Sequence, residues 1–171
     1  MVSGGAKSEA VVNYFVGNDR ESWRSDIPSF VSVGLGEVYD RIALDLKAHG
    51  NNVEKIFTVK PGGNPGRIQL VQEGADTLAI DESGCLVATI AGLGDARFTA
   101  PIAFQEIDGK RVDVPVRYAL GKAAGTYGFT LGAYDTAHDL VIDPVLGSAF
   151  VNGPFGAAGA QGFDMALDAQ T

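Results

Sequence analysis

The sequence is poor in the residues that build disulfides, metal centres and catalytic sites. Its 171 residues include one cysteine, Cys85, and two histidines, His49 and His138. One cysteine excludes an internal disulfide, and structural zinc needs four ligands with paired Cys or His spacing. The chain also has no G-x-S-x-G nucleophile elbow and no phosphate-binding G-x-x-x-x-G-K-[ST] loop. We therefore expect no metal, no cofactor and no catalytic residue, and we expect that the protein is not an enzyme.

Long apolar runs and clustered positive charge are lacking as well. No stretch approaches the roughly 20 apolar residues of a membrane-spanning helix. The first ten residues lack the apolar core of a signal peptide. With 13 basic and 21 acidic residues, the net charge is −8. Nucleic acids and anionic membranes are bound through Lys and Arg, so we expect no nucleic acid binding and no membrane insertion.

Calcium binding at two acidic turns is a second interpretation of the sequence. Asp81-Glu82-Ser83-Gly84 and the stretch Asp135–Asp139 carry carboxylates at turn positions. Neither stretch has the spaced ligand pattern of an EF-hand loop, so the pattern does not predict bound calcium.

Glycine and alternating apolar residues are abundant instead. The chain has 23 glycines. From Val53 to Ile90, short alternating segments are separated by Gly, Pro, Asp and Ser, which favour turns. Period-two alternation is typical of half-buried antiparallel strands. We predict strands over Val53–Val59, Arg67–Gln72, Thr77–Ile80 and Cys85–Ile90. The fold class predicted is all-β, an antiparallel β-sandwich built from short strands and hairpins.

The clearest predicted hairpin has Asp108-Gly109 at its turn, the residue pair that a type I′ turn favours. After it, apolar residues alternate from Val112 to Leu120 on one face. Pro115 interrupts that run and cannot donate to a ladder, which indicates a strand edge. The stretch Val38–Gly50 fits a helix and a strand equally well on its local pattern.

Composition divides the chain into three parts. Residues 1–10 are small and polar and are predicted to be a flexible segment. Residues 11–146 hold the predicted strands and form the β-sandwich domain. Residues 147–171 are a glycine-rich tail whose one candidate strand has no partner, so we expect the tail to lie outside the main core.

Aromatic residues give the only candidate ligand site. The single tryptophan, Trp23, is expected to pack under a loop, and a ligand-stacking role is the second interpretation. Sandwich domains often bind carbohydrates, and such a site needs two or three aromatic side chains exposed on one face. The candidates in this chain are Trp23, Tyr39, Tyr127 and Tyr134. This hypothesis rests on analogy between folds.

Six stretches together resemble a known family. They are Val12–Asp19 with Trp23, Val38–Leu44, Phe57–Gly63, Ile68–Gly84, Pro101–Gly109 and Leu131–Leu146. Over about Val11–Leu146 they are similar to a bacterial domain of unknown function that precedes SBBP-type β-propeller repeats in exported or surface proteins. The chain departs from that pattern at Asp40-Arg41 and at Phe104.

The resemblance implies an all-β protein that is secreted or on the cell surface, and it favours a strand over Val38–Lys47. It also implies that residues 147–171 are similar to the start of a propeller repeat, and it supplies no catalytic residue. Our first hypothesis is a non-catalytic structural or interaction module of a secreted or cell-surface bacterial protein. Its partners would be other domains of the same polypeptide or extracellular molecules. The alternative is a carbohydrate-binding β-sandwich module.

Overall fold

The computed structural model describes residues 2–49 and 52–144, and these residues are almost wholly β. Two short 3-10 turns, η1 (Arg20–Ser22) and η2 (Pro65–Arg67), are the helical segments among them. The predicted tail at 147–171 lies outside the described residues. The strands are β1 (Ser3–Gly4), β2 (Lys7–Tyr14), β3 (Arg24–Phe30), β4 (Ser32–Tyr39), β5 (Ile42–His49), β6 (Asn52–Val59), β7 (Leu70–Val71), β8 (Thr77–Ile80), β9 (Leu86–Ile90), β10 (Gly94–Phe98), β11 (Ile102–Ile107), β12 (Lys110–Asp113), β13 (Val116–Leu120), β14 (Thr126–Leu131) and β15 (Leu140–Asp143).

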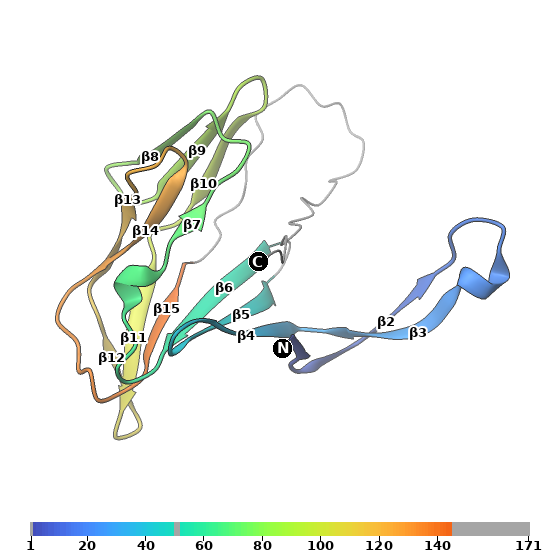
Figure 1. Cartoon of the computed structure of the whole chain (residues 1–171), viewed down its shortest axis with the longest axis horizontal. Helices are drawn as coiled ribbons and strands as arrows, with labels where there is room; N and C mark the ends of the chain where they lie inside the picture. Colours follow the sequence, from blue (N-terminus) through green and yellow to red (C-terminus); the bar gives the residue numbers. More distant parts are fainter. Residues whose placement is uncertain (1, 50–51, 145–171) are drawn as a thin grey trace.

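These strands form a body of three antiparallel sheets and a separate two-stranded ribbon (Figure 1). The large sheet has the order β1-β4-β5-β6-β15-β11-β12. Two three-stranded sheets, β13-β14-β7 and β10-β9-β8, complete the body. Strands β2 and β3 pair with each other alone. The predicted all-β antiparallel fold is confirmed.

The core lies where the large sheet faces the two smaller ones. Phe57 of β6 meets Phe129 of β14 edge to face, with ring centroids 6.1 Å apart. On the large sheet, alternate residues of neighbouring strands supply the buried side chains, as the period of two predicts. The buried apolar residues of the body are Ile42, Phe57, Val59, Ile68, Leu86, Ala88, Phe98, Ala103, Val114, Tyr118, Tyr127, Phe129, Leu140 and Ile142.

Pro115 marks the point at which the chain passes from one layer to the other. The alternation from Val112 to Leu120 predicted one continuous strand, but the structure divides it into β12 and β13. Before the proline, the Val114 amide donates to Ala103 O at 2.8 Å. After it, Pro115 O accepts from the Gly132 amide at 2.7 Å. Because proline has no N–H to continue a ladder, the two strands join different sheets.

The N-terminal part differs most from the prediction. Residues 1–10, predicted to be flexible, contain β1 and the first half of β2. Their small and polar side chains give no sign of the backbone pairing that orders them. In it, Gly5 N donates to Ser32 O and Val31 N donates to Ala6 O, both at 2.8 Å. Residues 11–30, placed in the sandwich by the sequence, belong to the β2–β3 ribbon and contribute nothing to its core.

The structure agrees with some of the other predicted segments and differs from others. The ambiguous stretch up to Lys47 is extended, with a turn at Asp40-Arg41 where Arg41 has a φ of 60°. The strand predicted over Arg67–Gln72 shrinks to β7, because η2 occupies its start. The sequence predicts no strand over β3 or over β10, and the structure has both.

The turn between β11 and β12 is as predicted. Asp108 and Gly109 have φ values of 52° and 71°, both in the left-handed region that a type I′ turn requires.

We expect Gly109→Val to destabilise the protein by ~1–3 kcal/mol, the cost of a β-branched residue at positive φ. No other atom lies within 4 Å of a Cβ added at Gly109, so the cost is conformational rather than steric. The measurement is the denaturant midpoint of unfolding. Gly109→Asn is the control and should change little, because asparagine tolerates this conformation. Equal midpoints for the valine and asparagine variants would contradict the assignment.

Candidate functional site: an exposed apolar ribbon

Strands β2 and β3 form a ribbon, Lys7–Phe30, that projects from one edge of the large sheet (Figure 1). The ribbon continues the pairing of β1 with β4 at that edge, since Ser3 is opposite Gly34 and Lys7 is opposite Phe30. Further out, Val11 is opposite Pro28 and Val12 is opposite Ile27. One long antiparallel pair therefore belongs to the body at its base and stands free beyond it.

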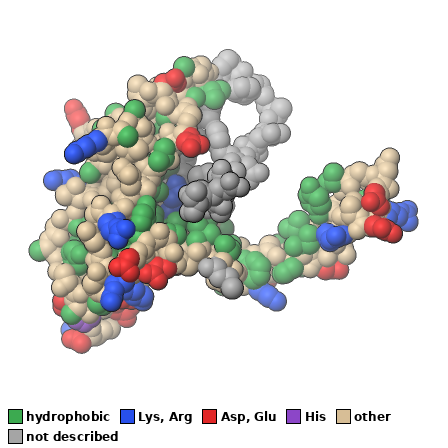
Figure 2. Space-filling model, viewed as in Figure 1, with side chains coloured by type: hydrophobic (Ala, Val, Ile, Leu, Met, Phe, Trp, Pro, Cys, Tyr) green, Lys and Arg blue, Asp and Glu red, His purple; other side chains and the backbone are tan. Residues whose placement is uncertain are grey.

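The ribbon exposes an unusual amount of apolar side chain. No residue from Lys7 to Phe30 is buried. The described residues include sixteen exposed large hydrophobic side chains, and seven of them lie in these 24 residues. Figure 2 shows hydrophobic side chains along the ribbon. The seven are Val11, Val12, Tyr14, Phe15, Val16, Ile27 and Phe30.

Aromatic contacts order the tip of the ribbon. The Trp23 ring meets Phe15 edge to face at 5.3 Å between centroids. Its indole Nε1 donates to Gly17 O at 3.2 Å, and the Arg20 guanidinium lies 5.6 Å from the ring centroid. Trp23 thus packs under the tip loop, the first of the two roles expected for it.

Polar side chains hold the backbone of the same loop. Asp19 caps η1 by accepting from the Glu21 amide at 3.0 Å. Asn13 accepts from the amide of Asp26, which has a φ of 56°, at 2.9 Å. Residues of the stretch Val12–Asp19 with Trp23 therefore build the tip by contacts within the ribbon itself. The ribbon is preorganised although it lies outside the core.

A free two-stranded ribbon is marginally stable in water because it has no layer to cover its side chains. Exposed apolar surface of this kind is typical of sites that contact another protein, a membrane or a ligand. The ribbon is therefore our candidate functional site.

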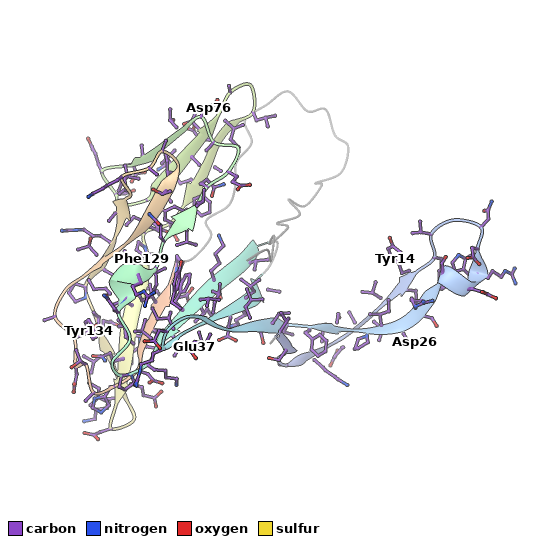
Figure 3. All side chains as sticks on the ribbon, viewed as in Figure 1. Tyr14, Asp26, Glu37, Asp76, Phe129 and Tyr134 are labelled. Atoms are coloured by element: carbon purple, nitrogen blue, oxygen red, sulfur yellow. The ribbon has the colours of Figure 1, made fainter. Side chains whose placement is uncertain are left out.

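The four aromatic residues proposed for carbohydrate binding do not share one exposed face. Tyr39 and Tyr127 both line a shallow groove of about 520 Å³ with Arg67, Gln69 and Leu120. Trp23 lies on the ribbon. Tyr134 packs against the core of the body, at the lower left in Figure 3. Tyr127 is only 4% exposed, and Tyr39 Oη donates to Gln69 O at 3.0 Å. The sequence shows that these four residues are aromatic, but it does not show how far each side chain is exposed.

A second open groove of about 420 Å³ lies on the outer face of the large sheet. Pro61, Phe104, Glu106, His138 and Asp139 line it. The buried side chain of Gln105 holds the loop between β14 and β15. Its Nε2 donates to Asp135 O at 2.7 Å, and its Oε1 accepts from the Asp135 amide at 2.8 Å. Gln105 belongs to the stretch Pro101–Gly109 that resembles the family, but the sequence predicts no role for it, since an internal glutamine gives no periodic signal.

Two pairs of charged or titratable groups meet at this groove. Lys60 Nζ contacts Asp139 at 2.5 Å, and His138 Nδ1 lies 2.9 Å from Asp135 Oδ2. The Ala137 amide, and then His138, lower the pKa of the Asp135 carboxyl from its usual value. His138 is a loop residue, as expected.

The other acidic turn is closed by its own contacts. One Asp81 carboxylate oxygen accepts from the Ser83 hydroxyl and from the Ser83 and Cys85 amides, and the other pairs with Arg97. These bonds, led by the one from the Ser83 hydroxyl, lower the pKa of Asp81. Among residues 2–49 and 52–144, no group of three or more His, Cys, Asp or Glu could hold a metal ion.

The molecule is thus a β-sandwich domain with an exposed apolar ribbon. The chain belongs to the family of the domain of unknown function DUF7948, whose sequence profile matches residues 1–145. None of the curated proteins and none of the solved structures compared with the chain matches it. In the described part of the chain, no helix is long and apolar enough to cross a membrane.

We expect Gln105→Leu to destabilise the protein by ~1–3 kcal/mol, because it removes the acceptor of the Asp135 amide and leaves the Asp135 carbonyl with only the longer 3.3 Å bond from the His138 amide. The measurement is the free energy of unfolding in denaturant. Gln69→Leu, at an exposed position, is the control. If both variants unfold at the same midpoint, Gln105 does not anchor the loop.

Stability should fall in alkali through Tyr127. Burial raises its pKa from 10.0 to about 12, so the folded protein keeps a proton that the unfolded chain loses in this range. This contribution is complete below pH 10 and is lost as the pH rises towards 12. Tyr127→Phe should melt at a temperature that falls less steeply over this window. Tyr14→Phe, on the exposed ribbon, should keep the wild-type slope, and a common slope for both variants would contradict the account.

Proposed function

We propose that this protein is a non-catalytic interaction module of a secreted or cell-surface bacterial protein, and that the β2–β3 ribbon makes its main contact. The observation that carries the proposal is the exposure of seven large hydrophobic side chains on a preorganised ribbon outside the core. The partner would be another domain of the same polypeptide or an extracellular protein. The resemblance to domains ahead of SBBP-type repeats supports the proposed location.

The alternative, a carbohydrate-binding module, receives less support from the geometry. Sugar platforms need aromatic faces open to solvent. Tyr127 is buried, the Tyr39 hydroxyl is bonded to the backbone, and Trp23 is packed by Phe15. Binding of the intact chain on a glycan array would favour this alternative.

A photo-crosslinking amino acid placed at single positions tests the proposal in the cells that produce the protein. At Val12, on the ribbon, we expect efficient crosslinks to protein. The matched control is Val112, which is similarly exposed on β12, at 44% against 49% for Val12. We expect several-fold higher crosslink yield at Val12, because a docked surface holds its partner within reach of the probe. Equal yields at the two positions would contradict the proposal.

A further inference from the structure

We propose that the ribbon docks against the ribbon of a second copy of this chain, so that two copies pair about a two-fold axis. This inference rests on the proposed function and names the partner. In a two-fold contact the same surface is used on both sides, so the surface has to be complementary to itself.

The size of the ribbon fits a stable dimer interface. Such interfaces bury roughly 800 Å² and about 20–30 residues on each side. The ribbon from Lys7 to Phe30 supplies 24 residues, none of them buried by the body. A small ligand would cover only a fraction of this surface, whereas a second ribbon is as long as the first.

Both faces of the ribbon are apolar. Val12 and Ile27 are opposite each other, and so are the neighbouring residues Val11 and Pro28. Successive residues of a strand point to opposite faces, so each face carries one of these pairs. A second ribbon presents the same apolar pairs, and two ribbons that wrap around each other can cover both faces, as a contact through all 24 residues requires.

Charge opposes contact through the ribbons less than contact through the bodies. The whole chain has a net charge of −8, so two copies repel each other. The ribbon carries only −1 of this charge, from three basic and four acidic residues: Lys7, Arg20 and Arg24, and Glu9, Asp19, Glu21 and Asp26. The remainder carries −7. Because the ribbon extends away from the body, the ribbons can meet while the acidic bodies stay apart (Figure 1).

Sedimentation velocity of the intact chain over the micromolar range tests this inference. The expected result is a mass that rises with concentration from the 17.8 kDa of one chain to twice that value. Val12→Lys should raise the dissociation constant about tenfold or more, because docking would desolvate an unpaired ammonium. Ile27→Lys, which alters the same cross-strand pair, is a second variant should Val12→Lys fail to fold.

Val112→Lys is the matched control and should dimerise like the wild type. A wild-type chain that stays monomeric at every concentration would overturn the inference, and so would equal weakening by the control. A monomer combined with ribbon-specific crosslinks in cells would leave the proposed function standing and assign the ribbon to a different protein. A monomer without such crosslinks would remove both.

Discussion

The packing of the large sheet against the two smaller sheets is the contact on which the rest of the structure depends. Ile42, Leu140 and Ile142 of the large sheet are fully buried, as is Leu86 of the opposite layer. Burying one such side chain contributes about 1.5–3 kcal/mol. This core fixes the strands that carry Gln105 and the loops around both grooves, so the polar contacts there are consequences of the packing rather than its cause.

The ribbon lies beyond the reach of that core. Its order comes from local contacts, such as Trp23 on Phe15 and the Asn13 bond to the Asp26 amide. Local contacts order a tip but leave the valines and Ile27 in water, which costs the isolated chain part of the hydrophobic free energy it could gain. The same surface becomes favourable when another surface covers it. This difference between body and ribbon is the physical basis of the proposed interaction role.

Much of the body could be predicted from the sequence, because alternation and turn chemistry act locally. Asp108-Gly109 determined its hairpin, and the segments Val53–Val59 and Thr77–Ile80 became β6 and β8 almost unchanged. Alternation does not reveal what covers an apolar face, so the sequence places Val11 and Val12 in the sandwich, whereas the structure has them on the ribbon. For the same reason, the sequence offers Tyr127 as a candidate for an exposed site although its side chain is buried. Burial depends on tertiary contacts that one segment does not encode.

Hydrogen exchange of the isolated chain at low concentration tests the central claim, that the ribbon stands outside the folded core. We predict slow exchange in the central strands β6 and β15 and much faster exchange throughout β2 and β3, because few contacts oppose local opening there. Ribbon amides protected as strongly as those of β6 in the dilute chain would show that the ribbon packs on the body, and would contradict the account.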